Sequence, residues 1–354
     1  MLTILLVSTA DTELLAAAAS GAGYLTANPA RVTADEVPAL AARADLVVLR
    51  LLGGRNAWAE GVAALVAAGK PLVALGGEAA PDAELMALST VPAGVATEAL
   101  AYLREGGPEN LRELARFLSD TVFLTGEGFS PPHPMPPQGL HLLPAPDSMI
   151  VSSPGHIAPI SAHDHENAPV VAVVFYRAHE LSGNTAFVDT LCGALAQRGT
   201  IPLPVFCASL RSADAQLAEL LSPADAVITT VLAAGGSAAA DATGESDWDA
   251  GLLASLDVPV LQGLCLTSSR AQWEASNAAL APIDAAMQVA IPEFDGRVIT
   301  VPFSFKEEGP DGIPRYAADP ERAARLAGIA VRHARLARTP NAAKRVAIML
   351  SSYP

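Results

Sequence analysis

Residues 45–75 read DLVVLRLLGGRNAWAEGVAALVAAGKPLVAL, and this stretch decides the fold. An apolar run at Asp45–Leu52 is followed by two glycines and an alanine-rich segment, which Gly69 ends, and a second apolar run follows at Pro71–Leu75. Short apolar runs that alternate with helical patterns are typical of parallel strands whose two faces are both covered. The stretch therefore predicts a strand, a helix over 57–68 and a second strand.

The same alternation recurs on both sides of this unit. A first strand is expected at Leu2–Val7, and a second α/β unit is expected to begin at Pro169 with PVVAVVFYR; its later strands include Met287–Ile291 and Val298–Phe303. Residues 125–168 are rich in proline and carry little periodicity, which is typical of an extended connector laid along a surface. The predicted fold class is α/β, with two consecutive doubly wound parallel-sheet domains of the Rossmann or flavodoxin-like kind, at 1–124 and 169–341, joined by the proline-rich connector at 125–168.

Residues 342–354 carry one more strand pattern. KRVAIML, at Lys344–Leu350, resembles the apolar starts of the two earlier units, and a buried parallel strand needs a crossover helix to cover it. We therefore expect residues 342–354 to hold the first strand of a third domain and the chain to be the N-terminal part of a longer protein. A last strand inserted into an earlier sheet is the alternative.

The composition restricts the class of partner. The chain has 354 residues, a net charge of −15, 51% hydrophobic residues and 17% charged residues, which suits a large buried core and excludes a disordered chain. The acidic balance argues against nucleic acid and against an anionic membrane, since both need clustered cations. The sequence shows neither the features of a signal peptide nor an apolar run long enough to span a membrane, so we expect a cytoplasmic protein.

Several common sites are absent from the sequence. No G-x-x-x-x-G-K-[ST] motif occurs, so the chain alone is not expected to hydrolyse ATP. Neither a G-x-S-x-G elbow nor a G-x-G-x-x-G turn after the first strand occurs. The three cysteines, Cys192, Cys207 and Cys265, do not have the spacing of a zinc site and are expected to be buried, reduced thiols.

The strongest polar cluster, Tyr176–Thr185, follows the strand that opens the second unit. It combines a cation, an imidazole, a carboxylate and a Gly-Asn-Thr turn that leads into a helix. Ligands of open parallel sheets bind outside the carboxyl ends of the strands, and helix N-termini favour anions. His179 and Glu180 together can ligate a borderline metal or move a proton, so they are the candidate catalytic and metal-binding residues. A capped turn with solvated charges is the alternative. The candidate substrate-binding residues of this cluster are Arg177, Asn184 and Thr185.

Three further clusters contain possible ligand groups. PEFDGR, at Pro292–Arg297, places two carboxylates before a glycine and is followed by SFKE; a site and a hairpin turn are both compatible with it. Arg50–Trp58 is a glycine-rich loop whose two guanidinium groups can hold a carboxylate. HDHE, at His163–Glu166, contains metal-ligand types, but a solvated linker is the favoured interpretation. The candidate substrate-binding residues of the first two clusters are Arg50, Arg55, Trp58, Glu293, Asp295, Arg297 and Lys306.

The residues of these clusters resemble those of a known family. Pro169–Leu195, PVVAVVFYRAHELSGNTAFVDTLCGAL, closely resembles the CobN family of cobaltochelatase large subunits, to which the H subunits of magnesium chelatase are related. The segments RLLGGRNAW, PEFDGR and SFKE also match, as do SR-x-x-W at Ser269–Trp273 and the closing PNAAKRVAIMLSSYP at Pro340–Pro354. The matches span nearly the whole chain in order. Family members are several times longer, which agrees with the longer protein expected above.

The resemblance implies a subunit that binds a tetrapyrrole for ATP-dependent insertion of Co²⁺ into hydrogenobyrinic acid a,c-diamide, on the aerobic route to cobalamin. Cobalt is then a substrate, while ATP and Mg²⁺ are used by partner subunits of the CobS and CobT kinds and not by this chain. The chain would contact the remainder of its own polypeptide and be inactive alone. The arginines at strand ends would receive substrate carboxylates, and His179 and Glu180 would assist proton and metal transfer.

Three other functions stay open from the sequence. The chain can be a non-catalytic scaffold or docking head for the ATPase subunits, or a magnesium chelatase component of the H type that acts on protoporphyrin. The third is a periplasmic-binding-like sensor of a small solute, against which the missing signal peptide and the long connector argue. The Tyr-Arg-Ala-His and Ser-Gly-Asn-Thr pattern favours cobalt over magnesium.

Overall fold

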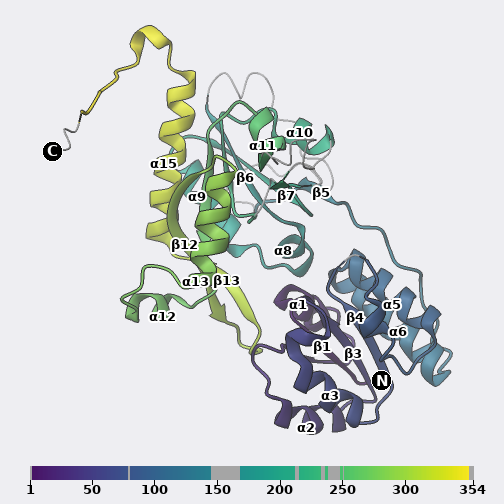
Figure 1. Cartoon of the computed structure of the whole chain (residues 1–354). Coiled ribbons are helices and arrows are strands. Elements are labelled where there is room, and N and C mark those ends of the chain that lie inside the picture. The colour runs from purple at the N-terminus through teal and green to yellow at the C-terminus, as the bar shows by residue number, and fades with distance from the viewer. Residues whose placement is uncertain are drawn as a thin grey trace, which may run out of the picture. The chain divides into compact units, whose positions relative to one another are not determined.

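The computed structural model describes residues 2–78, 80–144, 168–211, 215–232, 236–237, 248–249 and 251–350. The chain divides into two compact units (Figure 1). Each unit is built around a mainly parallel sheet, which confirms the predicted α/β fold with two consecutive domains. The first unit consists of Met1–Pro136, Ala178–Asn184 and Glu308–Arg315, and the second of Pro137–Arg177, Thr185–Glu307 and Tyr316–Pro354.

The first sheet has four parallel strands in the order β2-β1-β3-β4. Ile4 pairs with both Tyr24 and Leu46, so β1 lies between β2 and β3 and the strand order reverses there. The strands are β1 (Ile4–Ser8), β2 (Tyr24–Ala27), β3 (Leu46–Leu51) and β4 (Leu72–Gly76). The helices are α1 (Asp11–Ala19), η1 (Ala34–Glu36), α2 (Val37–Ala42), η2 (Arg55–Trp58), α3 (Ala59–Ala67), α4 (Ala83–Met86), α5 (Ala93–Glu105) and α6 (Gly107–Phe123).

The stretch 45–75 folds as predicted, except at the start of its helix. β3 and β4 occupy the two apolar runs, and Gly69, with a φ of 66°, follows the helix as a left-handed stop. The helix α3 begins at Ala59 and not at residue 57, because the four preceding residues form the 3₁₀ turn η2. The ring of Trp58 lies so close to Gly61 that a side chain there would collide with it. The ring of Trp58 thus packs on the first turn of α3, directly after the 3₁₀ turn.

Side chains of the first sheet alternate between two apolar layers. Leu6 and Val48 belong to the layer that α1, α5 and α6 cover, whereas Val7 and Leu49 belong to the layer that α2, α3 and α4 cover. Both faces of the sheet are therefore buried, which explains why its strands are almost continuously apolar. Helices lie on the two sides of these strands in Figure 1.

Residues 125–136, here called the proline strap, lie along α5 and α6. Side chains of these helices bind the backbone of the strap: Tyr102 donates to the carbonyl of Ser130 (2.5 Å), and Glu113 accepts from its N–H (2.7 Å). Asn110 bonds both backbone groups of His133, at 2.8 and 3.0 Å. The first residues of the connector are thus laid along a surface, and the first unit continues past residue 124, to Pro136. Residues 145–167 of the connector, and with them His163–Glu166, lie outside the described residues.

The second sheet has seven strands in the order β13-β12-β11-β8-β6-β7-β5. Strands β7, β6, β8, β11 and β12 are parallel, and β5 pairs antiparallel with β7. β6 lies between β7 and β8, just as β1 lies between β2 and β3 in the first sheet. The strand order therefore reverses between β6 and β8. These strands are β5 (Gln138–Leu140), β6 (Val170–Tyr176), β7 (Ile201–Cys207), β8 (Ala226–Thr229), β11 (Val260–Cys265), β12 (Val298–Glu308) and β13 (Pro314–Ala318); β9 (Gly236–Ser237) pairs antiparallel with β10 (Trp248–Asp249).

The helices of the second half are unequal in length, and one of them replaces an expected strand. Met287–Ile291 is helical and not the expected strand. The prediction failed because a short apolar run cannot be assigned to a strand or a helix by periodicity alone. Gln288 of this segment turns inward and bonds both backbone groups of Cys265, at 2.7 and 2.5 Å. The helices are α8 (Arg177–Ser182), α9 (Ala186–Ala196), α10 (Ala215–Leu221), α11 (Leu252–Ser255), α12 (Arg270–Ala275), α13 (Pro282–Ala285), the π-helix η3 (Ala286–Ala290), α14 (Ile291–Phe294), α15 (Pro320–Arg338) and η4 (Asn341–Ala343).

The second sheet is also covered on both faces. Val171, Val173 and Phe175 pack with α9 and α15, whereas Val170 and Val174 pack with α10 and α11. The sheet therefore repeats the layered construction of the first one. Among the described helices, none combines the length and hydropathy needed to cross a lipid bilayer.

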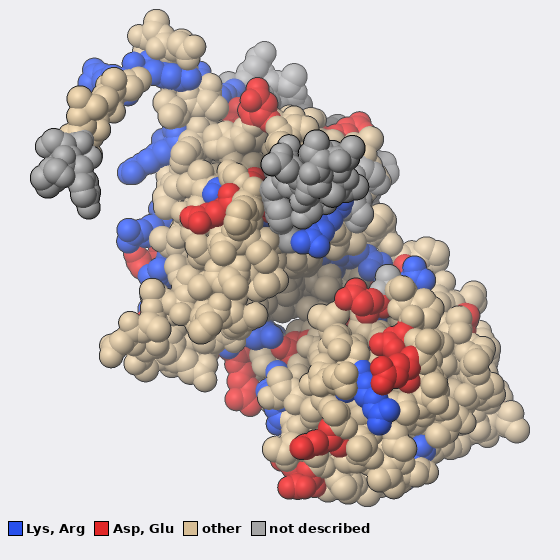
Figure 2. All heavy atoms as spheres, viewed as in Figure 1, with Lys and Arg blue, Asp and Glu red and all other residues tan. Residues whose placement is uncertain are grey.

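Charged side chains are mixed in sign over much of the face shown in Figure 2, with broad uncharged areas between them. The helix α15 differs, because blue side chains follow its length in that view. Residues 320–350 contain seven Lys or Arg and a single acid, Glu321, although the whole chain has a net charge of −15. The C-terminal part of the described chain is therefore basic within an acidic protein.

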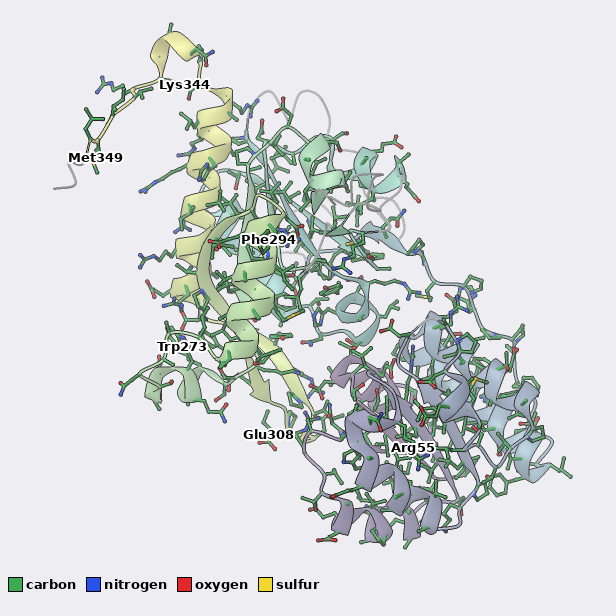
Figure 3. All side chains as sticks on the ribbon, viewed as in Figure 1. Arg55, Trp273, Phe294, Glu308, Lys344 and Met349 are labelled. Carbon is green, nitrogen blue, oxygen red and sulfur yellow. The ribbon has the colours of Figure 1, made fainter. Side chains whose placement is uncertain are left out.

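The segment expected to begin a third domain forms no strand in the described part of the chain. Residues 344–350 are irregular, and the side chains of Val346, Ile348, Met349 and Leu350 are 82–93% exposed (Figure 3). Four large apolar side chains in water are unfavourable, since each gains about 1.5–3 kcal/mol when it is fully buried. Their exposure is compatible with a covering partner, and the third domain stays a prediction.

Candidate functional site

Both sheets provide the position at which open α/β sheets bind ligands. Such sites lie outside the carboxyl ends of the strands, where the strand order reverses. In the first unit this position follows β1 and β3, and in the second it follows β6 and β8. The loop Arg50–Trp58 and the segment Tyr176–Thr185 begin at these strand ends, so the two polar clusters predicted from sequence lie at the expected edges.

Arg50 lies inside the first unit and supports its sheet. Its side chain is 8% exposed, and Nη1 lies 2.5 Å from Oε1 of Glu13. The same guanidinium donates to the carbonyls of Leu103 (3.0 Å) and Gly77 (3.2 Å). Burial raises the pKa of Glu13, while Arg50 and the hydroxyl of Ser8 lower it. Arg50 thus serves as an internal support, which differs from the substrate contact expected from the sequence.

Arg55 and Trp58 occupy the turn after the same strand. Gly53 and Gly54, with φ of 87° and 72°, allow the chain to leave β3 in the left-handed region that other residues avoid. Arg55 is exposed on η2 (Figure 3), whereas Trp58 is half-buried against the apolar layer. Of the three candidates in this loop, Arg55 alone presents an exposed charge.

The segment after β6 folds back on itself and joins His179 to Asn184. Gly183, with a φ of 67°, makes the reversal, and the N–H of Asn184 donates to the carbonyl of His179 (2.9 Å). The side-chain nitrogen of Asn184 lies 3.2 Å from Nδ1 of His179. Asn184 is 5% exposed, so its amide is held in place by the fold. The Ser-Gly-Asn-Thr motif therefore orients the imidazole.

This orientation decides which ring nitrogen carries the proton. When the Asn184 amide donates to Nδ1, the neutral ring keeps its proton on Nε2. A metal-binding imidazole instead needs an unprotonated nitrogen, and its other N–H normally donates to an acceptor. The pair therefore favours His179 as a hydrogen-bond or proton donor over the predicted metal ligand. Within the described residues, no three His, Cys, Asp or Glu side chains group as a metal site.

The other candidates of this segment lie on either side of the pair. Arg177 and Glu180 are half-buried on α8. Thr185 precedes α9, and its carbonyl accepts from the N–H groups of Val188 (2.8 Å) and Asp189 (3.0 Å). Thr185 thus starts a helix through its backbone, and its side chain makes no capping bond there.

The PEFDGR segment is an internal ion pair with one exposed acid. Asp295 and Arg297 have side chains that are 0% exposed, with 2.6 Å between Oδ2 and Nη2. Burial lowers the pKa of Arg297, while Asp295 and Tyr176 raise it. Glu293 is exposed on α14. Asp295 and Arg297 are therefore placed as structural groups, which differs from the direct substrate contact expected for them.

Lys306 lies apart from that pair, on β12. Its Nζ is 6.0 Å from the ring centroid of Tyr316, and the side chain is half-buried.

Two further residues, Tyr176 and Gln262, interact with Arg297, and neither was predicted as a site residue from the sequence. Gln262 is 0% exposed in an otherwise apolar strand, VLQGLC. A polar residue in such a run is a signal that could have identified it, because a buried amide requires partners.

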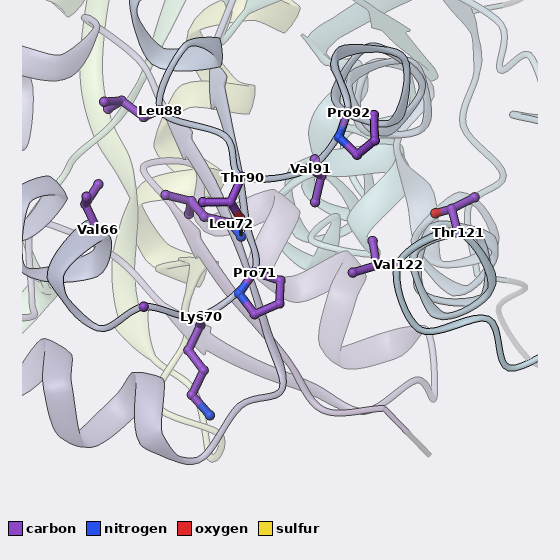
Figure 4. Close-up of a pocket in the computed structure, with 11 residues that line it drawn as sticks. Val66, Lys70, Pro71, Leu72, Leu88, Thr90, Val91, Pro92, Thr121 and Val122 are labelled. Atoms are coloured by element: carbon purple, nitrogen blue, oxygen red, sulfur yellow. Dashed lines mark hydrogen bonds between the residues drawn. The ribbon is translucent and has the colours of Figure 1, made fainter.

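The three cysteines and one cavity of the first unit contribute none of the predicted site residues. All three thiols are buried and unpaired, as predicted, and burial raises the pKa of Cys207 to about 12, so it is an unreactive thiol. A cavity of about 410 Å³ lies beside Lys70 and Pro71, at the amino end of β4 (Figure 4). Ligands of α/β sheets bind at the opposite end of the strands, and none of the predicted site residues lines this cavity.

Comparison with known proteins identifies the family. Residues 100–354 match the profile of the CobN/Magnesium Chelatase family. The aerobic cobaltochelatase subunit CobN of Pseudomonas aeruginosa is 36% identical over 330 residues, covering 88% of this chain and 25% of that protein. The H subunit of magnesium chelatase from Rhodobacter capsulatus is 27% identical over 279 residues, covering 72% of this chain and 22% of that protein. The catalytic subunit of cobaltochelatase from Mycobacterium tuberculosis superposes with a TM-score of 0.71 at 50% identity, covering 97% of this chain and 28% of that one.

Two mainly parallel sheets, each with a reversal of strand order and polar residues at its strand ends, define a protein of the α/β class. Within that class, the chain belongs to the CobN/magnesium chelatase family. It spans about a quarter of the length of the curated CobN proteins that it matches.

Proposed function

We propose that the chain is the N-terminal region of the tetrapyrrole-binding subunit of an ATP-dependent aerobic cobaltochelatase. The complete enzyme would insert Co²⁺, as a substrate, into hydrogenobyrinic acid a,c-diamide during cobalamin synthesis. Partner subunits of the CobS and CobT kinds would use ATP and Mg²⁺. The observation that supports this most is the 50% identity to a cobaltochelatase catalytic subunit over 97% of the chain. The lower identity to the H subunits of magnesium chelatase makes protoporphyrin the less favoured substrate.

The proposed substrate is an apolar ring edged with carboxylates and amides, and the strand-end loops offer matching groups. Arg55 is an exposed cation after β3, and Arg177 is a half-buried cation after β6. A guanidinium can hold a carboxylate through two parallel hydrogen bonds. Each of the two loops thus carries a cation that can hold a carboxylate of such a ligand.

His179 supports a role in the chemistry, because metal insertion must move protons on the pyrrole nitrogens. When Asn184 donates to Nδ1, the neutral ring carries its proton on Nε2, from which it would donate a hydrogen bond that orients the substrate. Glu180, the next residue, is the carboxylate that would accept a proton leaving a pyrrole nitrogen. We propose that this pair assists the loss of the pyrrole protons in these two roles and that cobalt is held elsewhere.

The test is cobalt insertion by the complete subunit together with its ATPase partners. His179→Ala is expected to lower kcat by about 100-fold, the lower range for loss of a general acid or base. Asn184→Asp would let Nδ1 donate, which moves the proton off Nε2, and should lower kcat while tetrapyrrole affinity is kept. His133→Ala is the control, because its side chain is exposed and only its backbone is bonded. Full activity of the His179→Ala, Glu180→Ala double variant would overturn this role.

A second candidate function is a docking head that binds no tetrapyrrole. Two observations favour it: Arg50 and Arg297 are used inside the fold, and the basic residues along α15 suit an acidic protein surface. A pull-down with the separate ATPase subunits distinguishes the two functions. Retention that is lost when Arg325 and Arg332 are changed to Glu, without any tetrapyrrole binding by the unaltered chain, would support the docking head.

A further inference from the structure

The peptide group between Val231 and Leu232 is held from both of its sides. Its carbonyl oxygen accepts from Nη1 of Arg297 at 2.5 Å. Its N–H donates to the hydroxyl of Tyr176 at 3.0 Å. A trans peptide points these two groups in opposite directions, so two side chains fix the orientation of one plane.

The holding groups link the peptide to both neighbours of β8. Tyr176 ends β6, while Nη1 of Arg297 also donates to Oε1 of Gln262 on β11 at 2.6 Å. Strand β8 lies between β6 and β11 in the sheet. The preceding turn is fixed as well, because the N–H of Val231 donates to the hydroxyl of Thr229 at 3.1 Å. The carboxyl end of β8 is therefore held at the place where the strand order reverses.

Burying the charge of Arg297 costs free energy, which indicates that the geometry it holds matters. Arg297 is a buried cation whose charge Asp295 offsets at 2.6 Å. Replacement of buried ion pairs by apolar residues is often neutral or stabilising, so stability alone gives little reason for one here. What an arginine adds is a fixed fork, which here binds a carbonyl, an amide oxygen and a carboxylate together.

We propose that Tyr176 and Arg297 form a clamp on the 231–232 peptide and so hold Leu232 in position to pack against the apolar ring of the tetrapyrrole. The inference rests on the proposed function. Leu232 is half-buried directly after the held peptide group, at the edge where α/β sheets bind ligands. Tyr176 and Arg297 are positioning residues, since neither needs to touch the substrate.

The experiment uses the complete subunit with Tyr176→Phe, Arg297→Lys and the double variant. Absorbance titration with the a,c-diamide gives Kd, and cobalt insertion gives KM and kcat. Each single variant is expected to raise Kd and KM about five- to tenfold, roughly the loss of one hydrogen bond, with kcat unchanged. The Kd of the double variant should be no higher than the higher of the two single-variant values, because both bonds hold one peptide group.

Hydrogen exchange tests the clamp without a ligand. Arg297→Lys leaves the bond from Leu232 to Tyr176 intact, yet the clamp predicts that the Leu232 amide exchanges about tenfold faster. Tyr24→Phe is the matched control: it removes a hydroxyl bond to the carbonyl of Leu111 (2.7 Å) in the first unit and should leave Kd unchanged. Arg322→Lys is the arginine control, since Arg322 donates to the carbonyl of Pro302 and not to the 231–232 peptide.

Each result decides one statement. Unchanged Leu232 exchange in Arg297→Lys would overturn the clamp. Faster exchange with an unchanged Kd, or additive effects in the double variant, would overturn its role in binding. If the unaltered subunit binds no a,c-diamide, the proposed function fails and the binding role with it, while hydrogen exchange still decides the clamp itself.

Discussion

Removing the Asp295 carboxylate tests whether PEFDGR is an internal ion pair or a ligand site. Asp295→Ala leaves the guanidinium of Arg297 with only two neutral acceptors, in a side chain that is 0% exposed. Loss of one partner from a buried ion pair costs about 3–5 kcal/mol. With a urea dependence of about 3 kcal/mol/M, the midpoint should fall by about 1–1.7 M. Glu293→Ala is the matched control, because this acid is exposed two residues away.

The assay must report the second unit alone. In a Trp58→Phe background, the fluorescent tryptophans are residues 248 and 273, which both belong to that unit. Glu293→Ala should shift the free energy of unfolding by no more than about 0.5 kcal/mol, as is usual at exposed positions. Asp295→Asn keeps the size of the side chain and should fall between the two. If Asp295→Ala and Glu293→Ala have the same midpoint, Arg297 is not a buried, paired charge and the reasoning fails.

Three further predictions concern the first unit. Gly77→Ala should lower the free energy of unfolding in urea by about 1–3 kcal/mol, because the added Cβ would lie 2.8 Å from the backbone of Leu52. Gly94→Ala, in open space on α5, should raise the free energy of unfolding by up to about 1 kcal/mol. Asn110→Ala removes both bonds to the proline strap at His133, and faster proteolysis within residues 125–136 is expected; an unchanged cleavage rate would contradict the strap. The hydrogen bonds from Arg315 lower the pKa of Asp311 to about 2, so this stabilisation is present above about pH 4 and is lost as the pH falls towards 2. Because the pair is about a third exposed, Asp311→Asn should remove less than about 1 kcal/mol at pH 6 and only a small part of that at pH 2, measured by urea unfolding at both values.

Much of the fold could be predicted because it follows from local pattern. Alternating apolar runs and glycine stops placed β3, α3 and β4 within two residues of their observed bounds. The strand predicted at Met287–Ile291 was wrong because the helical state of this run depends on Gln288 bonding a distant strand, which no local pattern reveals. The first unit also takes in Glu308–Arg315, where Ile313 is 4% exposed in its apolar layer.

The candidate site was predictable by position and less so by role. Polar residues after β3 and β6 lie at the expected edges of the sheets. Whether an arginine faces solvent or an internal acid depends on tertiary packing, so Arg50 and Arg297 could not be separated from Arg55 on sequence alone. The Asn184 contact that orients His179 depends in the same way on the reversal at Gly183.

Titration of the purified protein with hydrogenobyrinic acid a,c-diamide, followed by absorbance, tests the central claim most directly. The account predicts saturable binding, with affinity reduced in Arg55→Ala and unchanged in His133→Ala, a change in an exposed side chain of the proline strap. A folded protein that gives no spectral change at any concentration, yet retains the ATPase subunits in a pull-down, would contradict tetrapyrrole binding and leave the docking head as its function.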